Sequence, residues 1–325
     1  MTNIVEKKKK GRGVSDASFI APLDTLAQLP TKGFVNLKKR ARSKWYTNQI
    51  VKHLCEIDSP LTSYYRSSLY CGHIITQRDD KLTSQYCNTR CCNVCNRIRT
   101  AKMINGYLSQ VIDRPALEFV TLTQGPTCTA ENLPFVIRNM IRQLTLIMRV
   151  FRERRGIPIN GVRKLEVTYR PNTDLYHPHI HMIVDKAGKQ IIEEWLHRFP
   201  DADNKAQDLR SANSSSVKEL FKYATKIAVG KDFDVDSSTH KIDVYLRPLD
   251  VIFRSLKGKR IFQPFGNIKK VDEDVISLDA QTYTDIPKYT FVEWIWESHD
   301  WYSPVLDTTL TGYKPPTNLY FEVYE

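Results

Sequence analysis

Four cysteines, Cys71, Cys87, Cys92 and Cys95, constrain the fold of this chain more than any other sequence feature. Two thiols separated by two residues, with two more upstream, are typical of a tetrahedral zinc site. The spacing therefore predicts a module built around structural Zn²⁺, with Cys91 and His73 left open as replacement ligands. The chain has seven cysteines, an odd number, and its N-terminus shows no secretion signal, so metal is favoured over disulfides.

The charge of the chain favours a polyanionic partner. Lys and Arg number 48 against 36 Asp and Glu, a formal net charge of +12, and neutralising phosphates with cations releases condensed counterions. Three cations follow the cysteines on a helical pattern, and we predict that they contact DNA: Arg97, Arg99 and Lys102. A solvated helix face is the plainer interpretation. Apolar stretches are too short for a membrane span, so we expect no membrane contact and a cytoplasmic protein.

The order of the predicted elements is that of an α+β protein. With 325 residues the chain has room for about two domains. A basic arm at residues 1–35 precedes a helical and Cys-rich module at 36–112, with a helix over 36–54. A domain at 113–270 follows, and the role of residues 271–325 is open. Within it we expect a strand at 117–123, a helix at 131–155, strands at 162–170 and 179–184, and helices at 191–199 and 216–229.

Three histidines in five residues form the first candidate catalytic group. In a strand, alternate side chains share one face, so His179 and His181 point the same way. Two imidazoles at this spacing can share a divalent cation, and an antiparallel return places Glu166 beside them as the third ligand. Such a site keeps positions open for a phosphate oxygen and water. A solvated polar strand face is the alternative.

The helix predicted over residues 216–229 carries the second candidate group. Glu219 and Tyr223 lie one turn apart. Lys222 and Lys226 lie beside them, and we predict that these two cations bind a phosphate of the DNA. A tyrosine there could act as a nucleophile and the carboxylate as a base. Ser216 and Glu219 have the spacing of a capping box, so a surface helix with a Glu/Tyr pair is the plainer interpretation.

Taken together, these motifs resemble the rolling-circle replication initiators of small bacterial plasmids, in the HUH endonuclease superfamily. The resemblance is carried by Phe119-Val-Thr-Leu-Thr, by the strand with His179 and His181, by Glu219 to Tyr223, and by the cysteine block with its basic helix. It runs from about residue 71 to 229, and more loosely to residue 270. It implies an HUH-type five-stranded antiparallel sheet flanked by helices, with the histidines on a central strand.

The resemblance also implies roles for the residues. His179, His181 and Glu166 would hold Mg²⁺ or Mn²⁺, Tyr223 would be the nucleophile, and Glu219 would activate water at termination. The role of His177 stays open, as does the participation of another tyrosine such as Tyr169. Two positions depart from the family pattern, Cys91 and Asn93, and both concern the zinc site.

We therefore expect a metal-dependent nickase that forms a 5′-phosphotyrosyl link on single-stranded or extruded origin DNA. No phosphate-cradling loop is present, so a host helicase would unwind and a host DNA polymerase would extend the 3′-OH. A homodimer is left open. The alternatives are a relaxase or transposase of the same superfamily, and a zinc-ribbon DNA-binding regulator without catalysis.

Overall fold

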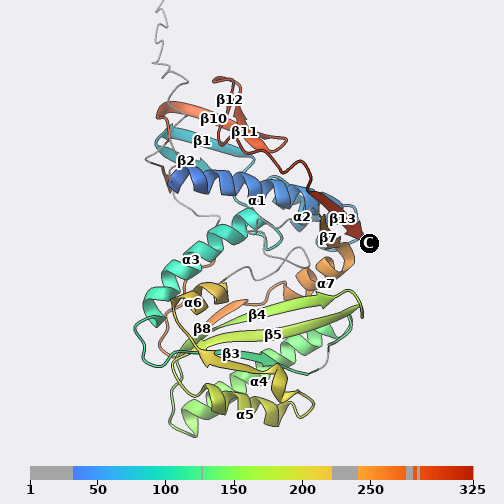
Figure 1. Ribbon diagram of the computed structural model, residues 1–325, viewed down its shortest axis with the longest axis vertical. Coiled ribbons are helices and arrows are strands. Elements are labelled where there is room, and N and C mark those ends of the chain that lie inside the picture. Colours follow the sequence, from blue (N-terminus) through green and yellow to red (C-terminus); the bar gives the residue numbers. More distant parts are fainter. Residues whose placement is uncertain (1–31, 126, 222–240, 276–280, 284–285, 325) are drawn as a thin grey trace, which may run out of the picture.

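The computed structural model describes residues 32–125, 127–221, 241–275, 281–283 and 286–324. In Figure 1 an upper part, built around a long helix and one sheet, lies above a lower part in which a second sheet covers two helices. The chain is α+β and its two larger sheets are antiparallel, which confirms the expected class. Among the described residues, no helix is both long and apolar enough to cross a bilayer.

The lower part contains a five-stranded antiparallel sheet whose central strand carries the histidines. Its order is β6-β3-β5-β4-β8, and each neighbouring pair is antiparallel. The strands are β6 Asp208–Ser211, β3 Glu118–Thr123, β5 Leu175–Val184, β4 Gly161–Arg170 and β8 Phe262–Phe265. The predicted strands at 117–123, 162–170 and 179–184 are therefore present, and the last starts four residues early.

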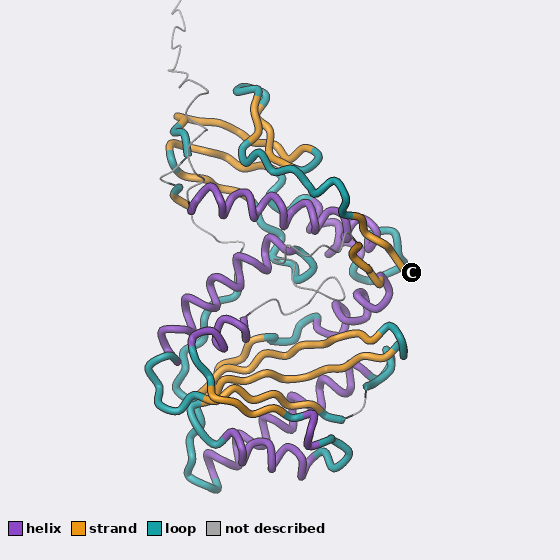
Figure 2. The backbone as a smooth tube through the Cα atoms, viewed as in Figure 1, coloured by secondary structure: helices purple, strands orange, loops and turns teal. Residues whose placement is uncertain are grey.

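Two amphipathic helices, α4 Leu133–Glu153 and α5 Gly188–Arg198, cover one face of this sheet (Figure 2). Apolar residues of α4 recur at intervals of three and four, and each is at most 3% exposed: Ile137, Met140, Leu144, Ile147 and Phe151. They form the main core together with the inward residues of β3, β4 and β5. The pattern that predicted a helix over 131–155 packed on a sheet is confirmed.

Two further helices, α3 Asn93–Val111 and α6 Ser214–Phe221, add to the same core. The ring of Phe221 stacks on Tyr107 at 5.4 Å and contacts Phe262 at 5.0 Å, which ties α6 to α3 and to the sheet.

The capping-box prediction for Ser216 is wrong. The side chain of Asn213 accepts hydrogen bonds from the backbone N–H of Ser215 and Ser216, so the helix starts two residues earlier.

In the upper part, the C-terminal segment completes a sheet begun two hundred residues earlier. The six-stranded order is β12-β11-β10-β1-β2-β9, and β10 pairs antiparallel with β1. Its strands are β1 Ile74–Asp79, β2 Lys81–Ser84, β9 Gln281–Thr282, β10 Tyr289–Glu297, β11 Asp300–Ser303 and β12 Thr308–Thr309. Strands β9 to β12, all of which follow residue 270, thus share one sheet with β1 and β2.

The helix α1 Lys32–Leu54 packs on this sheet and on α2 Thr62–Leu69. A third, small sheet joins β7 Lys241–Tyr245 to β13 Tyr320–Tyr324 in parallel. It leads into α7 Leu246–Leu256, whose apolar residues enter both the core of α1 and α2 and the core of the lower sheet. The upper and lower parts therefore share α7. A short 3₁₀ turn, Asn204–Ala206, precedes β6 in the lower part.

Candidate metal centres

The four predicted zinc ligands lie together. One sulfur from each of Cys71, Cys87, Cys92 and Cys95 lies within 4.8 Å of the others. Cys95 Sγ is 3.5 Å from Cys71 Sγ and 3.6 Å from Cys87 Sγ. A Zn–S tetrahedron with bonds of about 2.3 Å has edges of about 3.8 Å, so the group has the size that Zn²⁺ requires. Cys92 directly precedes α3 and Cys95 lies in its first turn, where the helix dipole favours thiolates.

The two alternative ligands do not join this group in the described structure. The sulfur of Cys91 lies 3.0 Å from Ser68 Oγ and packs with the apolar residues of α1 and α2. Burial raises the pKa of the Cys91 thiol to about 12, so the thiol stays neutral. His73 contacts Tyr70 instead. Adjacent cysteines therefore face opposite ways, Cys92 into the metal group and Cys91 into a core.

Lys44 is a buried cation beside the cysteine group that the sequence analysis did not single out. It is 1% exposed, and Nζ donates hydrogen bonds to the carbonyl oxygens of Cys71 at 2.7 Å and Leu69 at 3.1 Å. Burial lowers the pKa of Lys44 to about 8, against the opposing effect of the nearby cysteines. The lysine-rich pattern of α1 gave no sign that this residue points inward.

The second group is formed by Glu166, His179 and His181, as the antiparallel return predicted. Glu166 on β4 is paired with His179 on β5, and Glu166 Oε2 lies 4.0 Å from His179 Nε2 and 3.8 Å from His181 Nε2. Metal–ligand bonds of about 2.1 Å span these separations with one ion in the middle. The three residues meet the size requirement for a divalent cation, and the identity of the metal is not fixed by this geometry.

The histidine rings are oriented for metal binding by contacts at their other nitrogens. His179 Nδ1 lies 3.2 Å from the carbonyl oxygen of His177, and His181 Nδ1 lies 3.0 Å from Thr121 Oγ1. Such contacts hold the ring and leave Nε2 as the ligand atom. Burial, with a contribution from His179, lowers the pKa of His181 to about 3. The imidazole is therefore neutral at pH 7, the form that binds metal.

Lys164 is a cation in direct contact with this group. Its Nζ lies 2.6 Å from Glu166 Oε2, and its side chain is 4% exposed. Burial alone would raise the pKa of Glu166, but the adjacent ammonium keeps that pKa below its ordinary value. Alternation along β4 places residues 164 and 166 on one face, a signal that the sequence analysis did not use.

His177 shares the face of β5 with the two other histidines but lies outside the metal group. Its ring centroid is 5.5 Å from that of His179. Burial lowers the pKa of His177 to about 4, so it too is neutral. Its backbone oxygen also lies 3.2 Å from His179 Nδ1.

Glu219 is linked to the metal group through two side chains. Arg210 Nη2 donates to Glu219 Oε2 at 2.9 Å, and the Arg210 guanidinium lies over the ring of Phe119 at 4.5 Å. That ring in turn packs 5.6 Å from the ring of His181. The structure thus places Glu219 on the histidine side of the sheet. Tyr223, Lys222 and Lys226 lie outside the described residues.

The predicted DNA-contacting cations of α3 differ in their surroundings. Arg97 is half-buried, and Lys102 donates to the carbonyl oxygen of Asp274. Arg99 is 5% exposed, and its guanidinium donates to Asn88 and to Asn96 within the protein. The structure gives Arg99 an internal role that its position in a basic helix did not predict.

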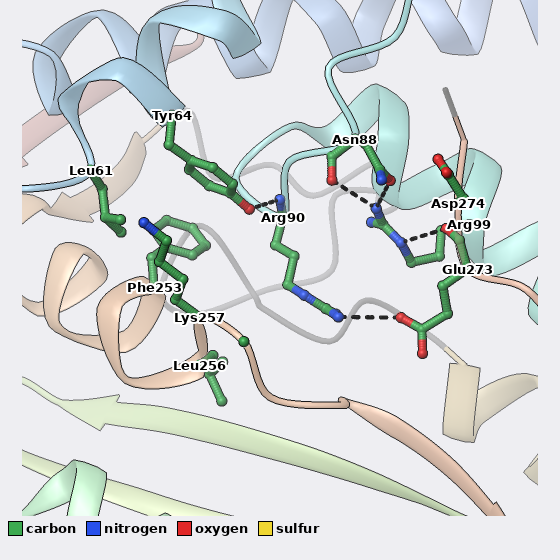
Figure 3. Close-up of a pocket in the computed structure, with 11 residues that line it drawn as sticks. Leu61, Tyr64, Asn88, Arg90, Arg99, Phe253, Leu256, Lys257, Glu273 and Asp274 are labelled. Atoms are coloured by element: carbon green, nitrogen blue, oxygen red, sulfur yellow. Dashed lines mark hydrogen bonds and ion pairs between the residues drawn. The ribbon is translucent and has the colours of Figure 1, made fainter. Parts of the chain in front are cut away.

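Arg99 borders a cavity of about 310 Å³ between the cysteine module and α7 (Figure 3). Arg90 crosses it to form an ion pair with Glu273 at 3.2 Å, and Tyr64 accepts a hydrogen bond from the backbone N–H of Arg90. The lining contains no member of either metal group. The ion pair between Arg90 and Glu273 connects the segment that carries the cysteines to residue 273.

The fold and the two side-chain groups define an α+β protein with two candidate metal centres, one of four thiols and one of two imidazoles and a carboxylate. Residues 80–187 match a family model described as a replication protein. The matched segment contains three of the four cysteines and all of the Glu166 group.

A curated relative agrees with this match. The chain is 26% identical over 220 residues to "Protein rep" of Staphylococcus aureus, an alignment that covers 61% of this chain and 92% of the relative. No solved structure matches significantly. The two matches confirm the resemblance to plasmid replication initiators inferred from the motifs.

Proposed function

We propose that this protein initiates rolling-circle replication of a plasmid by nicking one strand at the origin. The observation that carries the proposal is the group of Glu166, His179 and His181 on the central strands of a five-stranded antiparallel sheet. It lies within the segment that matches replication proteins. The order of histidine strand, Glu219 and a following tyrosine supports an HUH-type endonuclease.

The Glu166 group would hold Mg²⁺ or Mn²⁺, which supplies polarisation of the scissile phosphate and stabilises charge in the transition state. The hydroxyl oxygen of Tyr223 attacks phosphorus, and the bond from phosphorus to the 3′ oxygen breaks. The 5′ phosphate stays on the tyrosine, and the 3′-OH is released as a primer for a host polymerase. Glu219 activates the water that ends replication.

The cysteine group has a different task in this account. The four thiolates would hold Zn²⁺, which would fix the loop ahead of α3 and order the upper module, and that module would supply cations to the DNA. The DNA is single-stranded or extruded where it is cut, because a paired, stacked strand cannot present its phosphate in line to a tyrosine. A host helicase opens the remainder of the duplex.

Nicking of a labelled single-stranded origin oligonucleotide with Mn²⁺ tests the proposal. We expect Tyr223→Phe to abolish cleavage while DNA binding persists, and Tyr169→Phe to cleave normally. Tyr169 is a matched control because its hydroxyl is already bonded to Asp174 on the rim of the sheet. Binding without cleavage by the wild-type protein would instead support the DNA-binding regulator.

A further inference from the structure

Lys164 bonds the carboxylate oxygen that faces both histidines. Its Nζ lies 2.6 Å from Glu166 Oε2, and the same oxygen is 3.8 Å from His181 Nε2 and 4.0 Å from His179 Nε2. The Lys164 ammonium and a divalent cation would therefore share one oxygen atom. Both residues of the pair are buried, Lys164 at 3% and Glu166 at 7% exposure, so water screens this contact little.

The charge of the site follows from these neighbours. One carboxylate is offset by one ammonium, and a histidine that binds a metal ion does so as a neutral imidazole. Arg210, which lies over the ring of Phe119 beside His181, is itself paired with Glu219 and Asp208. The ligand group thus has no net negative charge to offset a divalent ion, and a buried ion without compensating charge is costly.

We propose that Lys164 makes divalent-cation binding depend on DNA: the ion binds weakly to the free protein and tightly when a backbone phosphate of the DNA completes the site. This inference rests on the proposed function, because it takes the phosphodiester as the ligand. The phosphate supplies the missing negative charge and an oxygen for an open position. By linkage, the ion must then strengthen DNA binding by the same factor.

Lys164 is a positioning residue in this account, since it acts through Glu166. Its ammonium weakens the carboxylate as a metal ligand in the free protein and so prevents a strong site from forming before the substrate is present. Replacing it by an uncharged side chain of similar length should therefore strengthen metal binding, an outcome that loss of a purely structural lysine does not produce.

Isothermal titration of zinc-loaded protein with Mn²⁺ tests the proposal. The Tyr223→Phe background prevents cleavage, and the oligonucleotide alone serves as the blank. We expect an oligonucleotide spanning the nick site to raise Mn²⁺ affinity at least about fivefold, the lower end of usual coupling between sites. Lys164→Met should raise the affinity of DNA-free protein by at least the same factor and reduce the effect of DNA. Lys189→Met, which removes an exposed lysine on α5, should change neither.

Two results overturn the proposal: equal Mn²⁺ affinity with and without DNA, or folded Lys164→Met protein that binds Mn²⁺ no better than its parent. If Lys164→Met does not fold, the test uses an oligonucleotide with an uncharged methylphosphonate at the nick site. We expect this oligonucleotide not to raise the Mn²⁺ affinity of the protein. An increase as large as that caused by unmodified DNA would refute the proposal. A protein that forms the tyrosyl adduct without this coupling leaves the proposed function intact. If the wild-type protein forms no adduct, the proposed function is refuted, and the inference that rests on it is refuted with it.

Discussion

Glu166 and His179 occupy directly opposed positions on neighbouring antiparallel strands, with Glu166 Oε2 4.0 Å from His179 Nε2. Opposed residues share one face of a sheet, whereas the adjacent Leu165 and Ile180 lie on the other face and are fully buried in the core. A register shift of one residue would turn Glu166 toward that core. The hairpin that brings β4 and β5 together is therefore what creates the metal group.

Glu166→Gln should reduce both Mn²⁺ binding and nicking. The amide keeps the size of the side chain but removes the charge that attracts the cation, and we expect nicking to fall by about 100-fold or more, as for loss of one transition-state contact. Cleavage rates and calorimetry check this. Glu153→Gln, on the exposed end of α4, is the matched control, and equal losses in both variants would contradict the assignment.

The adjacent cysteines should respond oppositely to the same substitution. Cys92→Ser removes a thiolate from the zinc group, so we expect loss of bound zinc and a lower unfolding temperature. Cys91→Ser should keep one zinc per chain, because the Cys91 sulfur contacts Ser68 and Thr89 and lies outside the zinc group. Zinc release by a chromogenic chelator measures both. Retention of zinc by Cys92→Ser would show that the ligand set is wrong.

Gly161 on β4 has no room for a side chain. A Cβ there would lie 2.1 Å from the backbone oxygen of Ile183 and 2.8 Å from the ring of Phe265. We expect Gly161→Ala to lower the free energy of unfolding by about 3 kcal/mol, the upper range of overpacking. A Cβ at Gly156 would have no atom within 4 Å, so only the positive φ of +64° opposes the substitution. We expect Gly156→Ala to lower the free energy of unfolding by about 1 kcal/mol. Urea unfolding compares them, and equal effects would argue against the tight β4–β5 contact.

Trp301 connects the C-terminal segment to the cysteine module. It is fully buried, and Nε1 donates to the carbonyl oxygen of Gly72, next to Cys71. We expect Trp301→Ala to destabilise the protein by about 3–5 kcal/mol and to accelerate zinc loss. Tyr302→Ala, which removes a half-buried ring bonded to Asp307, should have little effect on zinc. If Trp301→Ala released zinc at the wild-type rate, the C-terminal segment would not stabilise the cysteine group.

Glu219 should matter for the second cleavage rather than the first. In our account Glu219→Gln still forms the tyrosyl adduct but no longer activates water, so the adduct should persist. A time course of adduct against free protein measures this on a substrate with two nick sites. An equal loss of the first cleavage would indicate that Glu219 acts on the tyrosine or holds Arg210, its partner at 2.9 Å.

The parts of the fold that depend on local pattern could be predicted from the sequence. The spacing of apolar residues gave α4, the alternation around His179 and His181 gave the strand, and the cysteine spacing gave a group that the structure assembles. Each signal lies within one short segment of the chain, so no distant partner is needed to recognise it.

The parts that depend on distant partners could not. The strand β10 is a strand because it pairs with β1, far away in the chain. Lys44 is buried because carbonyl oxygens from another segment accept its hydrogen bonds, whereas lysines in general are mostly exposed. Arg99 is likewise held in part by a distant residue, since its Nε donates to the carbonyl oxygen of Glu273.

The measurement that tests the central claim most directly is the mapping of a covalent adduct on the wild-type protein. Zinc-loaded protein is incubated with Mn²⁺ and single-stranded DNA from its own plasmid's origin, then denatured, digested and analysed by mass spectrometry. We predict a phosphotyrosyl nucleotide on Tyr223 that a chelator or Glu166→Gln prevents. Protein that binds this DNA with both metal groups intact, yet forms no adduct or forms it on another tyrosine, would contradict the account.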